Sequence, residues 1–337
     1  MENKHTEADL AQMQSLPLSA KILMTQRRIR EWYEHWDGMV YVSFSGGKDS
    51  TVLKHLVENT PGVYDVPSVF VNTGLEYPEI QRFAMNQPNV NKISPKMRFD
   101  EVIKTYGYPV IGKEVARRIR YARKGAKWAL LNMKGLNAKG EPHKYIKGLY
   151  AKWEPYVDGA PFAISDQCCE VMKENPIDNY AKETGRKPII GTMASESQRR
   201  RKAWKITGCN AFDAKKPASK PMSFWTGQDV LQYIVENGIE YASVYGEIKQ
   251  DANGRYYTTG LNRTGCMFCM FGCHREGSPN RFQRMYKTHP RQYDYCMKPM
   301  EDGGLGLREV LEYIGVNPNP EPEQMCIFVM PEETGNE

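Results

Sequence analysis

The residues best suited to chemistry stand in one short stretch, Ser45-Gly46-Gly47-Lys48-Asp49-Ser50. Its two glycines allow a tight turn whose backbone N–H groups can face a ligand without an intervening side chain. Such amides form an anion site together with the N-terminus of a following helix, and Lys48 adds a positive charge. The stretch therefore predicts a loop that binds phosphate groups.

This stretch differs from the common P-loop, which has Gly six residues before its Lys and Ser or Thr directly after it. Val42 and Asp49 stand at those positions here. The stretch instead resembles the PP-loop of ATP pyrophosphatases, a family that cleaves ATP between the α and β phosphates. The resemblance implies that ATP and Mg²⁺ bind here, with Lys48, Asp49 and Ser50 as catalytic residues. The implied nucleotide-binding set is Ser43, Ser45, Gly46, Gly47, Lys48, Asp49 and Ser50.

A second stretch, Asn72-Thr73-Gly74-Leu75-Glu76-Tyr77-Pro78, follows an apolar run and reads as a turn before a helix. It resembles the second signature of the same nucleotide α-hydrolase family, which lies next to the adenosine moiety. The resemblance adds four residues to the nucleotide-binding set, namely Asn72, Thr73, Gly74 and Glu76.

Two separated groups of cysteines give the other chemical signal. Cys168 and Cys169 are adjacent, whereas Cys266 and Cys269 have the Cys-x-x-Cys spacing of metal or redox sites. Two cysteines from each group make four thiolates, enough for zinc or for an iron–sulfur cluster, and spacing alone does not separate the two. Cys273 is surplus to these four, and three roles stay open for it: an alternative ligand, a sulfur-carrying catalytic thiol or a buried small residue.

The cysteine pair lies in a longer region that is similar to the adenylylsulfate reductase branch of the sulfonucleotide (PAPS/APS) reductase family. The similarity covers roughly residues 38 to 275 and includes Lys173, Pro176 and the segments 190–201 and 221–234. In that branch, a Cys-Cys pair and a Cys-x-x-Cys motif bind one 4Fe–4S cluster near the nucleotide. The ligands implied here are Cys168, Cys169, Cys266 and Cys269.

Three consecutive arginines follow a predicted strand that ends near Gly191. So many adjacent charges cannot all face a core, and a position after a strand end suits the binding of phosphate or sulfate. We expect this set to hold the anionic part of the substrate: Arg199, Arg200 and Arg201.

The elements that must position these residues alternate between strands and helices. Residues 38–44, 68–71 and 188–191 read as buried strands, with helices expected over 19–36, from Ser50 and from Pro78. This order predicts an α/β fold, an adenine nucleotide α-hydrolase-like (Rossmann-like) parallel sheet with flanking helices and a cysteine-rich C-terminal region. Both predicted nucleotide-binding stretches would then lie at the carboxyl ends of strands, where ligands gather in such sheets.

Three regions follow along the chain. We expect a helical lead-in over 1–36, a PP-loop nucleotide-binding domain that includes the Cys-Cys pair over 37–235, and a cysteine-rich, basic and aromatic region over 236–337. The first nineteen residues are polar and expected to be loosely ordered, and residues 133–160 show no clear period and read as a loop or insertion. The basic stretch 107–127 fits a solvated helix or a phosphate-facing one.

Composition indicates a globular protein and excludes a secreted or membrane-spanning one. The chain has 337 residues, 40% of them hydrophobic, a net charge of +6, no signal-like start and no apolar run of about 18 residues. We expect a cytoplasmic protein without a membrane partner, in which the eight cysteines do not form a disulfide framework. The expected partners are an adenine nucleotide, a nucleic-acid substrate, a sulfur-donor or redox protein, and a second copy of the chain.

The choice between functions depends on the loop and on the tail. Sulfonucleotide reductases have no need to cleave ATP, and they use a nucleophilic Cys in a Glu-Cys-Gly-type tail. This chain keeps the loop intact, and its tail has Cys326 in an apolar run instead. An intact loop with a cluster resembles sulfur-inserting enzymes such as tRNA thiolases. The prediction is therefore adenylation of a substrate for sulfur transfer to a nucleic acid or nucleotide. The alternatives are a reductase that releases sulfite and a non-catalytic regulatory or defence-associated nucleotide-binding module.

Overall fold

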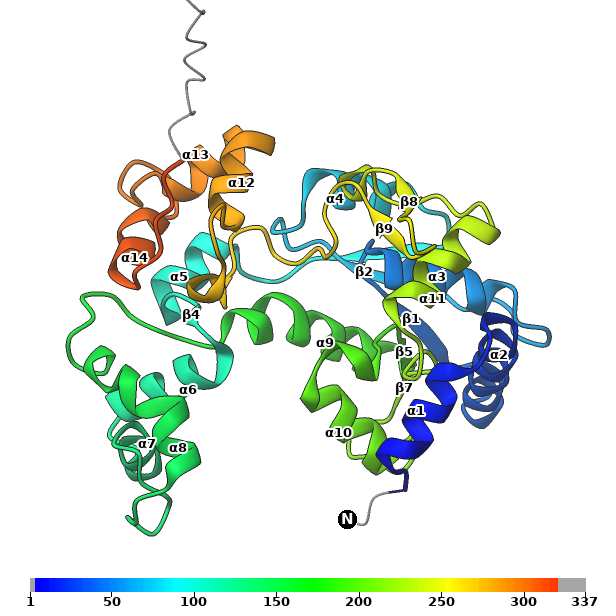
Figure 1. Ribbon diagram of the computed structural model, residues 1–337, viewed down its shortest axis with the longest axis horizontal. Coiled ribbons are helices and arrows are strands. Elements are labelled where there is room, and N and C mark those ends of the chain that lie inside the picture. Colours follow the sequence, from blue (N-terminus) through cyan, green and yellow to red (C-terminus); the bar gives the residue numbers. More distant parts are fainter. Residues whose placement is uncertain (1–3, 321–337) are drawn as a thin grey trace, which may run out of the picture. The chain divides into compact units, whose positions relative to one another are not determined.

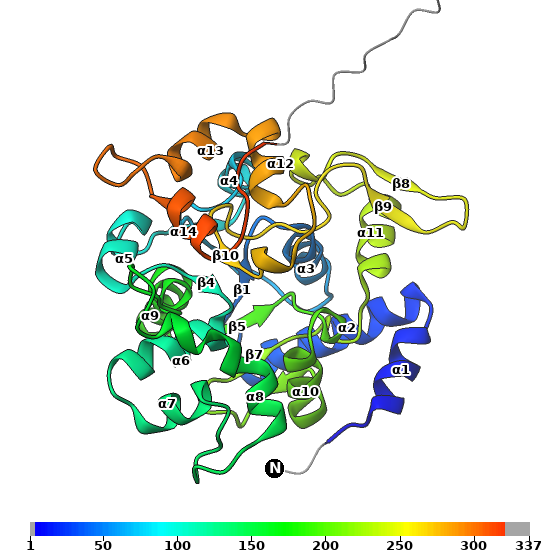
Figure 2. The same cartoon turned by 60° about the vertical axis from the view of Figure 1, so that its left-hand side comes forward.

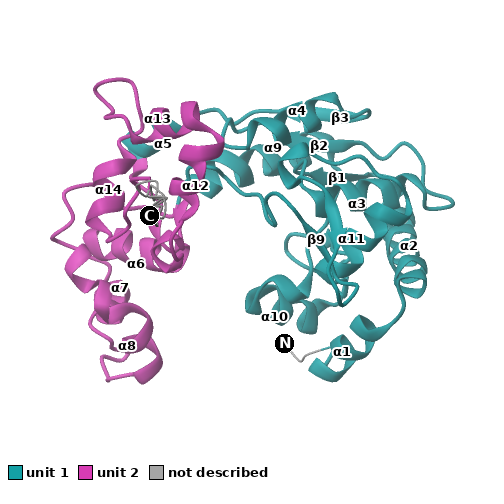
Figure 3. Cartoon of the chain, turned by 45° about the horizontal axis from the view of Figure 1, so that its top comes forward, with its two compact units in different colours: residues 1–105, 167–268 teal, residues 106–166, 269–337 magenta. Residues whose placement is uncertain are grey.

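The computed structural model describes residues 4–320 (Figure 1). The chain forms two compact units, each built from two segments (Figure 3). Unit 1 comprises Met1–Thr105 and Gln167–Phe268, and unit 2 comprises Tyr106–Asp166 and Cys269–Glu337. This division differs from the expected regions. Segment 106–166 belongs to unit 2 and not to the unit that contains the sheet, whereas residues 236–268 belong to unit 1. The expected boundaries after residues 36 and 235 both fall inside unit 1.

Unit 1 is built on a six-stranded sheet in the order β3-β2-β1-β5-β7-β6. All neighbouring strands are parallel except β6, which is antiparallel to β7. Val42 in the central strand aligns with Ser68 on one side and Ile189 on the other. The α/β fold with a mostly parallel sheet is confirmed. The strands are β1 Val40–Phe44, β2 Ser68–Val71, β3 Val90–Ile93, β5 Lys187–Ile190, β6 Asn210–Ala211 and β7 Ala218–Ser219.

Helices cover both faces of this sheet (Figures 1 and 2). Successive side chains of β1 point to opposite faces of the sheet, so neighbouring residues pack against different helices. Val40 and Val42 belong to a core shared with Trp32 of α2, whereas the ring of Tyr41 meets that of Tyr180 in α9, 5.2 Å away between centroids. The helices of unit 1 are α1 Glu7–Ser15, α2 Leu18–His35, α3 Lys48–Glu58, α4 Pro78–Asn86, α5 Phe99–Tyr106, α9 Asn175–Thr184, α10 Gln198–Thr207 and α11 Gly227–Glu236.

Shorter elements complete unit 1. A π-helical turn, Glu170–Glu174, leads from the cysteine pair into α9, and a hairpin of β8 Ile248–Gln250 and β9 Tyr256–Thr258 follows α11. Short 3₁₀ turns cover Ala194–Glu196 and Ser243–Tyr245. The expected loose N-terminus is wrong for α1, because Thr6 and Asp9 form a capping box at its start, and Lys205 pairs with Glu7.

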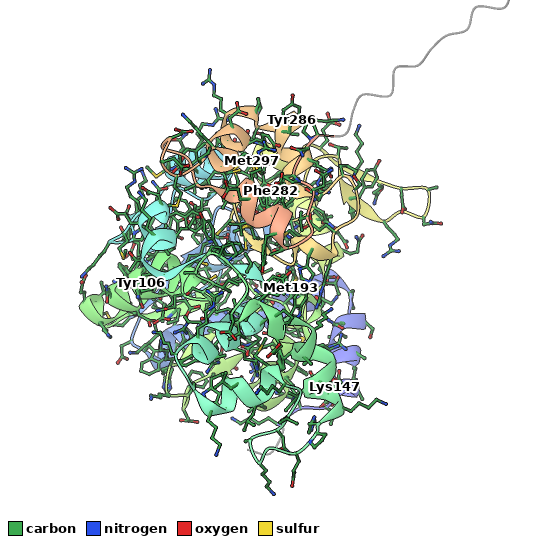
Figure 4. All side chains as sticks on the ribbon, turned by 90° about the vertical axis from the view of Figure 1, so that its left-hand side faces the viewer. Tyr106, Lys147, Met193, Phe282, Tyr286 and Met297 are labelled. Atoms are coloured by element: carbon green, nitrogen blue, oxygen red, sulfur yellow. The ribbon has the colours of Figure 1, made fainter. Side chains whose placement is uncertain are left out.

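Unit 2 is mainly helical, with one short parallel pair, β4 Val110–Ile111 and β10 Met270–Phe271. Its core includes the buried Phe282 and Met297, which Figure 4 labels together with the more exposed Tyr286. Within the part of the chain that the structure describes, no helix is long and apolar enough to cross a membrane. The helices are α6 Lys113–Arg123, α7 Lys127–Met133, α8 Lys144–Tyr150, α12 Arg281–Thr288, α13 Pro290–Met297 and α14 Leu307–Tyr313, with 3₁₀ turns over Ala151–Tyr156 and Cys273–Arg275.

The expectation of a loop over 133–160 is wrong for α8. This helix has only seven residues, too few to show a clear apolar period in the sequence. A side-chain cap from His143 starts it, and Gly135, at φ +79°, leaves room for the stem of Lys147. Because a Cβ at Gly135 would lie 2.9 Å from the Lys147 Cβ, close packing needs the glycine.

Candidate active site

The predicted phosphate loop connects β1 to α3 at the carboxyl end of the central strand. Gly46 has φ +72°, and a Cβ there would lie 3.0 Å from both Ala84 Cβ and Ile80 Cγ2 of α4. Gly47 caps α3, and a Cβ there would lie 3.2 Å from the Tyr245 hydroxyl. Neighbouring atoms thus approach both positions too closely for a larger side chain. At Gly46 the positive φ also favours glycine.

Two serines fix the shape of the loop. The Ser50 hydroxyl accepts a hydrogen bond from Ser45 N at 3.1 Å and donates one to Gly47 O at 2.9 Å. The Ser45 and Ser50 hydroxyl oxygens lie 3.0 Å apart. These contacts close a small ring at the start of α3 and fix the conformation of the loop.

Lys48 is the first residue of α3 and is buried. Its ammonium donates a hydrogen bond to Asn262 O at 2.7 Å, lies 3.9 Å from Asp49 Oδ1 and stands 5.3 Å from the centroid of the Tyr245 ring. The charge is thus held in place by the segment between Tyr245 and Thr264. Holding a cation at a helix N-terminus produces a strongly anion-attracting position.

The same segment covers the loop with two hydroxyl groups that sequence reasoning missed. The Tyr245 hydroxyl accepts a hydrogen bond from Lys48 N at 3.3 Å and lies 2.6 Å from Thr264 Oγ1. Burial raises the pKa of the Tyr245 phenol, so it is a neutral hydrogen-bonding group. No local motif marks Tyr245 or Thr264, because they reach the loop only through the tertiary fold.

A cavity of about 160 Å³ opens on the β1 and β2 side of the loop. Its lining includes Ser43, Ser45, Glu76, Lys173 and Thr264. Of the second predicted stretch, Glu76 therefore faces the cavity.

The other residues of that stretch shape the turn. The Thr73 hydroxyl donates to Glu76 Oε1 at 2.7 Å, and Asn72 Oδ1 accepts from Gln81 at 2.8 Å. Gly74 has φ +72°, a conformation that glycine adopts without strain.

A larger cavity of about 400 Å³ opens on the α3 side of the loop. Lys48, Asp49, Glu196 and Arg263 are among the residues that line it. Asp49 Oδ1 is buried and has no hydrogen-bond partner among the described residues. Burial raises the pKa of the Asp49 carboxyl, Lys48 opposes this rise, and Glu196 adds to it. The Asp49 carboxylate offers a hard oxygen donor of the kind that Mg²⁺ prefers, whereas both oxygens of Glu196 are engaged by arginines.

The three predicted arginines do not act as one group. Arg200 forms an ion pair with Glu196, which also pairs with Arg263 at 2.5 Å. Arg201 instead lies 3.8 Å from Glu7 Oε2 of α1. Arg199 and Arg200 line a third cavity, of about 230 Å³, together with Lys220. Burial, and then Arg200 and Arg199, lower the pKa of Lys220, so this cavity is strongly positive.

Three of the four predicted cluster ligands belong to unit 1, and two of them, Cys169 and Cys266, lie near Lys173. Cys168 Sγ and Cys169 Sγ lie 4.0 Å apart, and Lys173 donates a hydrogen bond to the Cys266 thiol. Burial lowers the pKa of Lys173, but Cys266, Glu76 and Cys169 together raise it above its ordinary value.

The fourth predicted ligand, Cys269, is the first residue of the second segment of unit 2. Within residues 4–320, no three His, Cys, Asp or Glu side chains are gathered closely enough to hold a metal ion. The donor chemistry nonetheless fits a thiolate-bound group, because the described cysteines form no disulfides and Lys173 lies near Cys266 and Cys169.

Cys273 lies in an environment unlike that of a nucleophile. Its thiol is buried, donates a hydrogen bond to Met270 O at 3.0 Å, and has a pKa that burial raises to about 12. Such a thiol stays protonated at neutral pH. Of the isolated cysteines, Cys209 and Cys296 are also buried, with pKa values raised to about 11 and about 12, and Cys326 lies outside the described residues.

Comparison with known proteins fits this geometry. The model of the phosphoadenosine phosphosulfate reductase domain matches residues 39–109 and 112–279, and this range contains the loop, all three cavities and the predicted cysteine ligands. The chain belongs to the phosphoadenosine phosphosulfate reductase domain family. This membership supports an enzymatic function in general.

Among solved structures, the chain is similar to the phosphoadenylyl-sulfate (PAPS) reductase from Candida auris, determined as a phosphate complex. The two are 14% identical, with a TM-score of 0.37, over 76% of this chain and 100% of that one. No curated protein matches the sequence.

Proposed function

We propose that this family member is an AMP-forming ATP pyrophosphatase that adenylates a substrate in preparation for sulfur transfer to a nucleic acid or nucleotide. The observation that carries the proposal is the complete phosphate loop with its buried Lys48. A buried cation costs desolvation free energy, and an anionic ligand at the same place offsets that cost. Adenylyl sulfate and phosphoadenylyl sulfate are already activated and carry no β,γ-phosphates that could bind at this site.

The loop residues take distinct roles in the proposal. The amides of Gly46 and Gly47 and the Lys48 ammonium would hold the β,γ-phosphates, while Ser45 and Ser50 keep the loop in shape. Asp49, whose Oδ1 lacks a hydrogen-bond partner among the described residues, would help to place Mg²⁺ together with Ser50. When bound, Mg²⁺ would neutralise charge on the pyrophosphate oxygens.

The bond changes are those of an adenylyl transfer. A substrate oxygen attacks the α-phosphorus, the bond to the α,β-bridging oxygen breaks, and pyrophosphate leaves with the bonding electron pair. The proton of the attacking oxygen passes to solvent. Hydrosulfide released by a donor protein then attacks the activated carbon, so that the substrate–oxygen bond breaks with AMP as the leaving group, a substrate–sulfur bond forms, the proton on sulfur passes to solvent and no net oxidation occurs. Fixed donors such as Lys48 stabilise the charge that develops on pyrophosphate.

The cysteines are proposed to hold a 4Fe–4S cluster through Cys168, Cys169, Cys266 and Cys269. When bound, the cluster would supply a sulfur-binding or electron-carrying centre. Lys173 places a positive charge beside Cys266, and this suits a ligand set of thiolates. Cys273 has no part in the proposal, because its buried thiol stays protonated.

The second candidate is a sulfonucleotide reductase that releases sulfite from adenylyl sulfate or phosphoadenylyl sulfate. The positive cavity lined by Arg199, Arg200 and Lys220 favours it, since sulfate and phosphate groups both suit such a site.

The deciding experiment incubates anaerobically purified protein with α-labelled ATP, Mg²⁺ and a mixture of nucleic acids. We expect AMP and pyrophosphate, with a loss of about a hundredfold or more in Lys48→Ala. Lys182→Ala, in an exposed lysine of α9, serves as the matched control and should keep full activity. Sulfite release from adenylyl sulfate with reduced thioredoxin, without ATP cleavage, would replace the proposal by the reductase.

The cluster is tested separately by iron and sulfide content. We expect Cys169→Ala to lose iron and sulfide, and Cys209→Ala, which changes a buried thiol outside the proposed ligand set, to keep them. Zinc in place of iron, or equal iron content in the two variants, would contradict the cluster assignment.

A further inference from the structure

Positive charge is concentrated in one part of the chain, the segment Tyr106–Asp166 of unit 2. Its 61 residues include twelve Lys and Arg against five Asp and Glu, a net charge of +7, whereas the whole chain carries +6. The remaining residues therefore sum to −1. Ordinary solvated surfaces intersperse both signs of charge, so this segment departs from the usual composition.

The arginines of this segment are engaged within the unit. Arg123 donates hydrogen bonds to four backbone carbonyls, among them Val157 O at 2.7 Å and Phe162 O at 2.8 Å. Arg118 pairs with Glu114 at 2.8 Å and lies 3.9 Å from the centroid of the Tyr150 ring.

Arg120 pairs with Asp166 at 2.8 Å. Of the basic stretch 107–127, Arg120 therefore serves the packing of α6 rather than a phosphate. Two of the five acidic residues, Glu114 and Asp166, are thereby paired inside the segment.

The lysines are different, because they face solvent. Seven of the eight are exposed, and none of these seven forms an ion pair within residues 4–320. Lys147, labelled in Figure 4, is one of them. We call this set the lysine surface: Lys124, Lys127, Lys134, Lys139, Lys144, Lys147 and Lys152. Unpaired lysines on short helices and turns attract polyanions through their combined field.

Exposed aromatic rings accompany the lysines. Tyr145 is 70% exposed and Trp128 37% exposed. Cationic side chains with accessible rings between them suit a nucleic acid strand, since the lysines neutralise phosphates and the rings stack on unpaired bases. An anionic membrane would need a continuous exposed apolar helix face, whereas α6 buries Ala116, Ile119 and Ala122 and α7 exposes Trp128 and Leu130 but buries Ala129 and Met133.

We propose that segment 106–166 is a docking surface for single-stranded nucleic acid, held through its phosphodiester backbone by the lysine surface and through base stacking by Tyr145. The idea that the docked strand is the acceptor of the adenylation rests on the proposed function, whereas the docking itself does not. Binding is therefore measured without ATP, so that failure of docking and failure of the ATP chemistry give separate results.

The test is fluorescence anisotropy of the full-length protein with labelled single-stranded DNA, single-stranded RNA and duplex DNA over a series of salt concentrations. The key variant changes Lys134, Lys139, Lys144 and Lys147 to Gln. The matched control removes the same charge from four exposed unit 1 lysines that form no ion pair within the described residues: Lys92, Lys96, Lys104 and Lys182. We expect the key variant to bind at least about tenfold more weakly, with a salt slope smaller by about 3, and the control to bind within about twofold of the wild type.

A second variant tests the stacking. Tyr145→Ala should weaken binding of the single strands by about fivefold or more and leave duplex binding unchanged. Comparison of the DNA and RNA strands then identifies which of the two is the preferred source of the phosphodiester chain. The proposal is overturned if the key variant and the control weaken binding equally, if duplex DNA binds as tightly as the single strands, or if anionic phospholipid vesicles bind the lysine surface more tightly than the strands do.

Discussion

Asp49 shows at the scale of a single residue how a buried carboxylate without a hydrogen-bond partner lowers stability. Its Oδ1 is buried without a hydrogen-bond partner among the described residues, although a carboxylate normally finds one. Burial raises the pKa of this carboxyl, with Lys48 opposing and Glu196 adding to the rise. In the folded protein the charged form is therefore less favourable than in the unfolded chain. The proposed cation would remove this penalty when it binds.

The first prediction concerns Asp49→Asn. Because the folded pKa is raised, the wild type carries its full penalty at pH values above that pKa and loses it as the pH falls towards the ordinary Asp value. We expect Asn to raise the melting temperature at pH 7, with a difference that shrinks on acidification. Activity with Mg²⁺ and ATP should fall by about a hundredfold.

Thermal unfolding between pH 4 and pH 7, beside the AMP assay, measures both effects of Asp49→Asn. Glu58→Gln is the control, because its carboxylate lies at the surface of α3 in a pair with Lys54. A variant at Asp49 that is less stable than the wild type at pH 7 would show that the carboxylate is held favourably without a cation.

Sequence reasoning located the loop well because local rules determine it. A β-branched strand, a turn of two glycines and a helix start are all readable within about fifteen residues. Ser45, Lys48 and Ser50 accordingly occupy the expected junction of β1 and α3. Asn262, Tyr245 and Thr264 lie some two hundred residues away and touch the loop only through the tertiary fold, in which α11 packs against α3 and strand β9 of the following hairpin packs against α11. No spacing rule marks such partners.

At the scale of elements, a buried ion pair joins the helix before the sheet to a helix near the end of unit 1. The ammonium of Lys21 in α2 lies 2.8 Å from both carboxylate oxygens of Asp229 in α11. The Lys21 side chain is 3% exposed and that of Asp229 10%. Asp229 also accepts hydrogen bonds from Thr226 N and its hydroxyl, closing the capping box of α11. The pair thus fixes where α11 begins against α2.

The second prediction is that Lys21→Met destabilises the protein by about 3 kcal/mol, because the Asp229 carboxylate stays buried after its partner has gone. Adding Asp229→Asn should restore part of the loss, since the amide removes the orphan charge and still accepts from Thr226. Chemical denaturation of the single and double variants measures the coupling.

Lys54→Met provides the matched comparison for Lys21→Met. Lys54 is also buried, but its partner Glu58 is 40% exposed, so breaking that pair should cost under about 1 kcal/mol. Equal losses in the two methionine variants would mean that burial of the lysine stem, rather than the stranded carboxylate, sets the cost.

At the scale of the whole molecule, unit 2 illustrates what sequence order conceals. Its two segments are separated by about a hundred residues of unit 1. They join through the parallel pairing of Ile111 with Phe271 and through the Tyr108 hydroxyl, which donates to Leu305 O at 3.1 Å. The sequence offers no local signal for this division, because the two segments are far apart in the chain. Only long-range strand pairing and ring packing make the two segments one unit.

The last prediction tests whether those two segments form one cooperative unit. The ring of Tyr313 in α14 meets the rings of Tyr156 and Phe162 edge to face, at 5.4 and 5.3 Å between centroids. Each such contact contributes about 1 kcal/mol, so Tyr313→Ala should weaken the attachment of segment 106–166 by about 2 kcal/mol. We expect faster amide hydrogen exchange in 151–166 and in β4, with β1 and β2 unchanged.

Tyr286→Ala is the control for Tyr313→Ala, because the two tyrosines are similarly exposed, at 42% and 41%. The ring of Tyr286 in α12 packs on that of Tyr293 in α13, with centroids 5.2 Å apart. Its removal in Tyr286→Ala should leave the amides of segment 106–166 protected from exchange. If Tyr313→Ala left exchange in 106–166 unaltered, the segment would fold independently of the chain after Cys269. The lysine surface could then be studied as an isolated fragment. If exchange rises as expected, nucleic-acid docking depends on both segments, and a truncation that removes the chain from Cys269 onward should abolish it together with the fold of unit 2.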